Sequence, residues 1–231
     1  MLQILRKYSE DGLAEVVENW AVGMPQQVHY YGQLLSINDC LHKNIYRAKY
    51  LIYTDLDEVI MPLRHPSWNA LMRDIDKPKQ GTFIFENTFL YSTQSRRTVV
   101  RQCDGSGFNV SVPTPRYLNF RNRSKPWDSR SGIAKYITKT AVTLVPQVHK
   151  VEILAQEYGS KLVPLSQALL YHYRVPYRHR GFAPINKRIQ DTIMDSYENK
   201  LLTAITNRLC DMARQQLAGK IIETNENCII S

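Results

Sequence analysis

The hydrophobic and polar positions along the chain follow a helical period first and a strand period immediately afterwards. From Gln33 to Arg47, apolar residues recur every three or four positions, which predicts an amphipathic helix that covers a sheet. The run from Tyr50 to Tyr53 is then continuously apolar and aromatic, which predicts a buried strand. A helix that leads directly into a buried strand is typical of α/β proteins.

Similar patterns predict the other elements. Segments rich in strand-forming residues and bounded by Gly, Pro, Asn or Ser predict strands at residues 14–20, 81–86, 98–103, 139–145, 148–154 and 167–173. Helical spacing predicts short helices at 2–8 and 68–72 and a long amphipathic helix at 187–217 that packs on the body. Residues 104–133, which are polar and basic, are expected to form a long loop or lid.

Composition adds limits on size and partners. With 231 residues, of which 43% are hydrophobic and 10% aromatic, the chain can bury the core of one large domain. It contains neither an apolar run of 18 residues nor a recognisable signal peptide, so no membrane-spanning helix is predicted. The net charge of +9 indicates an anionic partner, but no nucleic-acid-binding motif accompanies it.

The four cysteines are dispersed and form no CxxC pair, which excludes zinc ribbons and thioredoxin-like redox sites. Their even number permits disulfides in an oxidising compartment, with connectivity left open. Two glycosylation sequons, at Asn109 and Asn122, fit a lumenal location.

Three carboxylates follow the strand that ends at Tyr53. In an extended chain Asp55 and Asp57 share one face, and Leu56 turns back into the core. At about 4 Å and an effective dielectric of about 20, two carboxylates repel by roughly 4 kcal/mol, so a cation is expected to neutralise them. Mg²⁺ or Mn²⁺ would do so and would keep positions open for phosphate oxygens. The alternative is a solvated loop whose carboxylates only cap the next element.

A histidine ends another apolar strand and is followed by basic residues. His172 is the candidate that completes the metal shell, with His149 as a second candidate in a weaker context. Arg174 and Lys187, together with the arginines between them, are candidates for binding the phosphates of a nucleotide. The alternative for His172 is a hydrogen-bonded core histidine beside surface arginines.

Motifs for covalent catalysis, P-loops and dinucleotide fingerprints are absent from the sequence. The remaining chemistry is a metal-assisted displacement in which the cation stabilises a departing diphosphate. If that displacement inverts a sugar carbon, it also needs a carboxylate base. Glu86, Asp104 and Asp128 are the candidates, and the sequence does not choose between them.

A block of residues from Tyr30 to Trp68 resembles glycosyltransferase family 92. The residues that carry the resemblance are Tyr30–Gln33, Ile37–Leu41, Asn44, Tyr46, Arg47, the strand into Asp55–Glu58, Pro62 and Trp68. Shorter fragments follow in the family's order at Gly81–Phe83, Phe89, Lys135–Ile137, His149 and Leu170–Arg174. The similarity covers about residues 14–185.

The resemblance implies an α/β fold of GT-A type, a Rossmann-like domain with a mixed sheet that binds a nucleotide sugar. It implies transfer of a hexose, galactose from UDP-galactose, onto a glycan of a glycoprotein or glycolipid with inversion. Asp55 and Asp57 would hold Mn²⁺ (or Mg²⁺), Glu58 would orient them, and His172 would complete the shell. Family members sit on the lumenal side of the Golgi membrane through an N-terminal anchor. Neither that anchor nor the opening βα unit is visible here, so an N-terminally truncated catalytic domain at 1–185 and a helical tail at 186–231 are expected.

Two other classes of function remain open. A non-catalytic remnant of such a domain would bind glycans or polyanions through its basic surface, with salt-sensitive and metal-independent affinity. A metal-dependent nuclease or phosphatase would also use carboxylates at a strand end, but the sequence lacks the additional metal-site acids expected of one.

Overall fold

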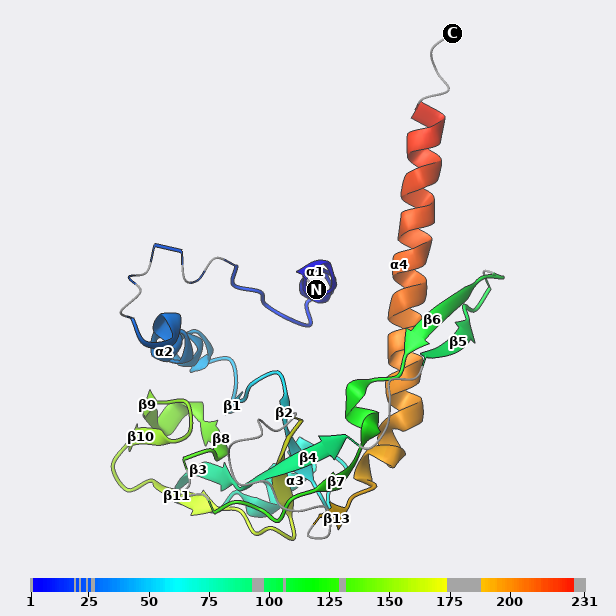
Figure 1. Ribbon diagram of the computed structural model, residues 1–231. Coiled ribbons are helices and arrows are strands. Elements are labelled where there is room, and N and C mark those ends of the chain that lie inside the picture. Colours follow the sequence, from blue (N-terminus) through cyan, green and yellow to red (C-terminus); the bar gives the residue numbers. More distant parts are fainter. Residues whose placement is uncertain are drawn as a thin grey trace.

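Two mixed β-sheets form the centre of the computed structural model, which describes residues 2–18, 20, 22–23, 25, 28–92, 98–105, 107–128, 132–173 and 188–226 (Figure 1). The four-stranded sheet has the order β1 (Tyr50–Tyr53), β8 (Lys135–Lys139), β3 (Gln80–Phe85), β11 (Gly159–Leu162). The five-stranded sheet has the order β13 (Ile189–Gln190), β7 (Phe120–Arg123), β4 (Asn87–Ser92), β12 (Ala168–His172), β2 (Glu58–Pro62). The pairs β11–β3 and β12–β4 are parallel and the other pairs are antiparallel.

The two sheets meet where β3 passes into β4. Glu86 alone separates these strands, and its carbonyl accepts a hydrogen bond from the Leu170 amide of β12 at 2.9 Å. Two smaller ribbons lie outside this centre: β9 (Thr143–Pro146) with β10 (Val151–Leu154), and β5 (Thr98–Gln102) with β6 (Asn109–Pro113).

Three of the four α-helices in the described residues pack against the sheets. The helices are α1 (Leu2–Glu10), α2 (Gln33–Asn44), α3 (Trp68–Ile75) and α4 (Glu198–Glu226), with 3₁₀ turns η1 (His29–Gly32), η2 (Arg116–Asn119), η4 (Thr140–Val142) and η6 (Ile193–Tyr197). The apolar face of α3 supplies Leu71 and Ile75 to one core cluster with Phe83 of β3. Another cluster joins Ile37 of α2 to Tyr53 of β1. The helix predicted from Gln33 and the strand predicted after it are thus confirmed, as is the mixed α/β class.

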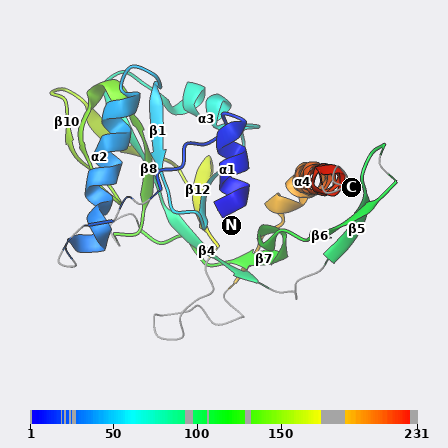
Figure 2. The same cartoon turned by 90° about the horizontal axis from the view of Figure 1, so that it is seen from above.

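The helix α4 extends away from the sheets and lies beside the β5–β6 hairpin (Figures 1 and 2). A disulfide between Cys103 and Cys210 joins the two elements. Near its start, α4 packs Leu202 into the core cluster under the five-stranded sheet, and Arg208 pairs with Asp11 at 2.6 Å. Within the part of the chain described here, no helix combines the length and apolar composition needed to cross a bilayer.

Several predicted elements differ from the structure. The segment predicted as a strand at 14–20 forms no strand in its described part, because it lies along no partner strand and Val17 is exposed. The predicted loop at 104–133 contains β6, η2 and β7. Its overall polar composition did not indicate these strands, which bury Val112 and Phe120 between polar residues. The predicted helix at 187–217 begins only at Glu198, after β13 and η6, and the predicted strand at 139–145 is divided by η4.

Candidate active site

The acidic residues occupy the short loop between β1 and β2. This loop turns tightly, since the Glu58 amide donates to the Asp55 carbonyl at 3.0 Å. Leu56 is 89% exposed, so the expectation that it turns into the core is wrong. The extended geometry behind that expectation ends at Tyr53, where β1 ends.

Three hydrogen bonds fix the loop. The Asp55 amide donates to Oε2 of the buried Glu58 at 3.1 Å. The Tyr173 amide, which follows β12, donates to the Asp57 carbonyl at 2.8 Å, and the Tyr117 hydroxyl donates to the Leu56 carbonyl at 2.9 Å. The loop is therefore held from β2, from the end of β12 and from η2.

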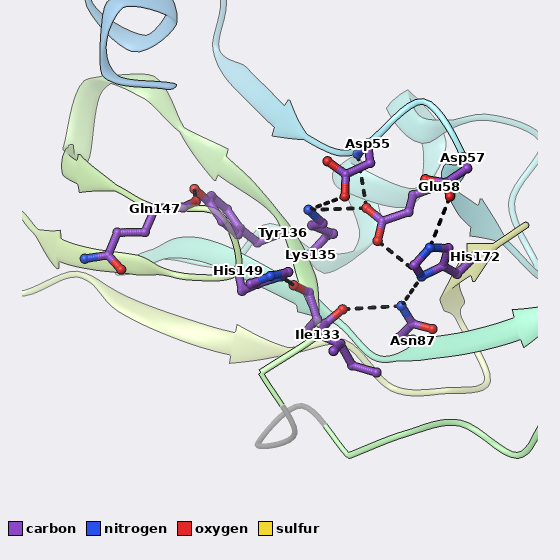
Figure 3. Close-up of polar contacts among 11 residues, drawn as sticks. Asp55, Asp57, Glu58, Asn87, Ile133, Lys135, Tyr136, Gln147, His149 and His172 are labelled. Atoms are coloured by element: carbon purple, nitrogen blue, oxygen red, sulfur yellow. Dashed lines mark hydrogen bonds and ion pairs between the residues drawn. The ribbon is translucent and has the colours of Figure 1, made fainter. Parts of the chain in front are cut away.

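His172 faces Asp57 across this loop (Figure 3). The antiparallel register of β12 on β2 sets His172 opposite Glu58. His172 Nε2 lies 3.4 Å from Asp57 Oδ2, and Nδ1 lies 3.5 Å from Glu58 Oε1. Phe89 stacks on the imidazole with a centroid separation of 5.0 Å, and the histidine is buried.

Asn87 contacts the Nδ1 side of this imidazole. Its Nδ2 donates to the Ile133 carbonyl at 3.3 Å and lies 3.2 Å from His172 Nδ1. Nδ1 therefore lies beside both the Asn87 amide and Glu58 Oε1, whereas Nε2 lies toward Asp57. Asn87 Oδ1 is buried and has no hydrogen-bond partner among the described residues.

Lys135 lies between the other two carboxylates. Its Nζ is 3.2 Å from Asp55 Oδ2 and 3.4 Å from Glu58 Oε2, and its side chain is 2% exposed (Figure 3). Asp55 is thus directed toward Lys135, whereas Asp57 is directed toward His172. Among the described residues, three carboxylates, one ammonium and one imidazole share the site, and the carboxylates carry the excess charge.

Burial controls the titration of the site's inner groups. It raises the pKa of the Glu58 carboxyl, although the Asp55 amide and Lys135 oppose this effect. It lowers the pKa of His149, whose Nδ1 contacts the Ala134 carbonyl at 3.1 Å. His149 is therefore held by the backbone next to Lys135, whereas His172 is the histidine that faces Asp57.

A comparison with protein families places these residues in a known group. The profile of glycosyltransferase family 92 matches residues 1–212. The chain belongs to glycosyltransferase family 92. Membership of this family implies a glycosyltransferase that uses a sugar donor and an acceptor. A comparison with curated proteins finds no match.

In this family 92 glycosyltransferase, the side chains at the loop are of the types that bind a divalent cation. Their positions in this structure do not bring three ligands to one point. Carboxylate oxygens and a neutral imidazole are ligands that Mn²⁺ accepts. Asp57 and His172 converge, but Asp55 pairs with Lys135, and no group of three acidic, histidine or cysteine side chains in the described ranges is arranged to hold a metal. A complete site requires Asp55 to leave Lys135.

The structure separates the candidate bases. Glu86 is half-buried at the junction of β3 and β4. Asp128 is exposed beside Trp127, whose ring packs edge-on against Phe89 at 5.6 Å. Asp104 lines a cavity of about 430 Å³ between the β5–β6 hairpin and α4. The predicted phosphate-binding residues, Arg174 and Lys187, lie outside the described residues.

Sequence reasoning gave no chemical role to Lys135, Asn87 or Tyr117. The sequence did carry a signal for Lys135. It stands beside the apolar residues that become β8, and a lysine in a buried strand is rarely found without a charged partner. Asn87 and Tyr117 carried no such signal, since their contacts with His172 and Leu56 depend on strand order and register.

Proposed function

We propose that the protein transfers a hexose, galactose from UDP-galactose, onto a glycan with inversion, in a reaction that depends on Mn²⁺ or Mg²⁺. The observation that carries this proposal is the approach of Asp57 Oδ2 to His172 Nε2 at 3.4 Å, beside Asp55 at the end of β1. A GT-A type fold is part of the proposal. The family match and the mixed sheets support it.

The charges of the site support a cation as the missing component. Asp55 and Glu58 pair with Lys135, and Asp57 lies beside His172. A divalent cation at Asp55, Asp57 and His172 would balance these carboxylates and supply Lewis-acid stabilisation of a departing diphosphate. His172 can be a ligand through Nε2 only with its proton on Nδ1. Glu58 Oε1, at 3.5 Å, is the acceptor for that proton, so Glu58 would orient the ligand.

Asp128 is our proposal for the general base. It is exposed, and Trp127 and Phe89 connect its segment to the imidazole of His172. Asp104 lies in a separate cavity and Glu86 is half-buried. Asp128→Asn should lower kcat by about 100-fold and leave UDP affinity unchanged, as expected for loss of a general base. Asp104→Asn is the matched control, and an equal loss in both variants would contradict this assignment.

The test of the donor site is calorimetric titration of UDP-galactose into the folded chain with and without Mn²⁺. We expect metal-dependent binding that is lost in Asp55→Ala/Asp57→Ala. Asp74→Ala, on the exposed face of α3, is the control and should bind as the wild type does. The non-catalytic alternative predicts a different result: salt-sensitive binding to a polyanion, with an affinity that neither Mn²⁺ nor the Asp55→Ala/Asp57→Ala change alters.

We infer that the chain works in an oxidising compartment, the Golgi lumen. The disulfide between Cys103 and Cys210 supports this location, because such bonds persist in secretory compartments and are rare in the cytosol. Alkylation of the protein isolated from cells, followed by mass spectrometry, should leave Cys103 and Cys210 unmodified until a reductant is added. Alkylation of both cysteines without reductant would contradict the inference. Cys40, which is a free thiol, is the internal control.

A further inference from the structure

Lys135 is a buried ammonium group to which the proposed reaction assigns no role. It stands at the start of β8, one residue beyond the last pair with β1, and its side chain is 2% exposed. Nζ contacts Asp55 and Glu58 at 3.2 and 3.4 Å. The position therefore places a positive charge within the carboxylates that we propose as the cation site.

The two partners of Lys135 differ in how much they need it. Glu58, 3% exposed, is the counter-ion that a buried ammonium requires. Asp55 is 51% exposed and could be hydrated by solvent, yet its Oδ2 is directed to Lys135 and not to the pair formed by Asp57 and His172. The Lys135–Asp55 pair thus occupies a proposed cation ligand without being needed for burial.

A divalent cation and the ammonium compete for Asp55. A cation that binds alone must take this carboxylate from Lys135 and then lie near an ammonium group that keeps Glu58 as its partner but has lost Asp55, and the two positive charges repel each other. A diphosphate bound together with the cation removes the conflict, because its oxygens accept hydrogen bonds from an ammonium group. The geometry therefore makes the bare cation bind more weakly than the cation that binds together with the diphosphate.

We propose that Lys135 couples cation binding to donor binding, a role that rests on the proposed function. In the donor-free protein Lys135 holds Asp55 and disfavours the bare cation. When a nucleoside diphosphate and the cation bind together, Lys135 releases Asp55 to the cation and donates to the diphosphate. Lys135 is thus a donor-binding residue as well as a positioning residue for Asp55.

The test is calorimetric titration of Mn²⁺, with and without UDP, into the wild type and Lys135→Met. In the wild type, UDP should tighten Mn²⁺ binding by about tenfold or more. In Lys135→Met, bare Mn²⁺ should bind about tenfold more tightly than in the wild type, and the enhancement by UDP should shrink by a similar factor. Lys139→Met is the matched control, because Lys139 lies on the same strand and pairs with Asp76 at 2.6 Å; it should keep the wild-type enhancement.

Each result separates this inference from the function on which it rests. If Mn²⁺ and UDP bind together to the wild type and the enhancement is unchanged in both Lys135→Met and Lys135→Gln, the coupling role is wrong and the donor site stands. If the wild type binds neither, the proposed function is wrong as well. Should both variants fail to fold by circular dichroism, the wild type alone decides: equal Mn²⁺ affinity with and without UDP overturns the inference.

Discussion

The two ends of the β1–β8 strand pair each hold a lysine, but the surrounding charges differ. At one end, Asp76 accepts from Lys139 at 2.6 Å, from the Tyr50 hydroxyl at 2.5 Å, and pairs with Lys49 at 3.3 Å. One carboxylate is there shared by two ammonium groups and a hydroxyl. The charge of Asp76 is therefore neutralised by groups of the protein itself.

The other end has the opposite excess. Lys135 faces Asp55 and Glu58, and Asp57 approaches the imidazole of His172. In the part of the chain that the structure describes, three carboxylates share one ammonium group at this end, so an additional cation would be stabilising. The same pair of strands therefore builds a structural ion cluster at one end and a candidate cation site at the other.

The pKa values of the two ends move in opposite directions. Burial tends to raise the pKa of Asp76, but hydrogen bonds from Lys139, Tyr50 and Lys49 together outweigh it and the pKa is lowered. Burial of Glu58 prevails over its partners and the pKa is raised. Folding therefore favours ionisation of Asp76 and disfavours ionisation of Glu58, relative to the unfolded chain.

The largest expected effect is on the structural end. Asp76→Ala should lower the free energy of unfolding by about 3 kcal/mol, because Lys139 loses its buried counter-ion. Urea denaturation measures this change. Asp57→Ala is the comparison at the other end, where removing a half-exposed carboxylate from an acidic cluster should change stability by less than about 1 kcal/mol. Similar losses in both variants would remove the distinction between the two ends.

An effect of intermediate size is expected in the pH dependence of stability, which compares Glu58 with Asp76. Because the pKa of Glu58 is raised, the stability of the wild type relative to Glu58→Gln should fall as the pH rises from about 4.3 through the folded-state pKa. The fall is about 1.4 kcal/mol for every tenfold difference between the acid dissociation constants of Glu58 in the folded and unfolded protein. Unfolding curves at a series of pH values measure the difference, and a wild type that gains on Glu58→Gln over this range would contradict the assignment.

At Asp76 the stability of the wild type relative to the Asp76→Asn variant should change with pH in the opposite direction. The lowered pKa of Asp76 means that its stabilising effect is present above about pH 3.9 and is lost as the pH falls through the folded-state value. The wild type should therefore gain stability relative to Asp76→Asn as the pH rises through the acidic range. If the stability differences for Glu58→Gln and Asp76→Asn changed with pH in the same direction, the two ends would not differ in their pKa shifts.

The smallest expected effect concerns His149, beside Lys135. Burial lowers its pKa, so its neutral form stabilises the fold above about pH 6.5 and this stability is lost as the pH falls. The advantage of the wild type over His149→Gln should decrease as the pH falls from 7 to 5. His42→Gln, on an exposed position of α2, is the control and should show no such change. An advantage that grows toward pH 5 would be inconsistent with a lowered pKa.

Strong periodicity made part of the fold predictable. The helix from Gln33 and the strand to Tyr53 have long apolar patterns that tertiary contacts reinforce, and both were predicted with nearly correct bounds. The strands β6 and β7 were missed because both are short and set their buried apolar side chains, Val112 and Phe120, among polar residues. Residues 14–20 satisfied the strand pattern but have no partner strand in their described part, a condition that local sequence cannot reveal.

The candidate site was predictable only as far as its chemistry could be recognised locally. Asp57 and His172 each follow or end an apolar strand, and the structure brings them together, while metal binding by them stays a prediction. The position of Lys135 beside Asp55 depends on the register of β8 on β1, which pairs Tyr136 with Tyr53. Register is set by the whole sheet, so this contact could not be derived from sequence spacing.

The most direct measurement is anomalous X-ray diffraction from crystals grown with Mn²⁺ and UDP. We predict an anomalous peak bound by Asp55, Asp57 and His172, with Lys135 turned from Asp55 to a phosphate oxygen. Well-ordered UDP with no manganese at these residues, or manganese bound elsewhere while Lys135 still pairs with Asp55, would contradict both the proposed cation site and the role of Lys135.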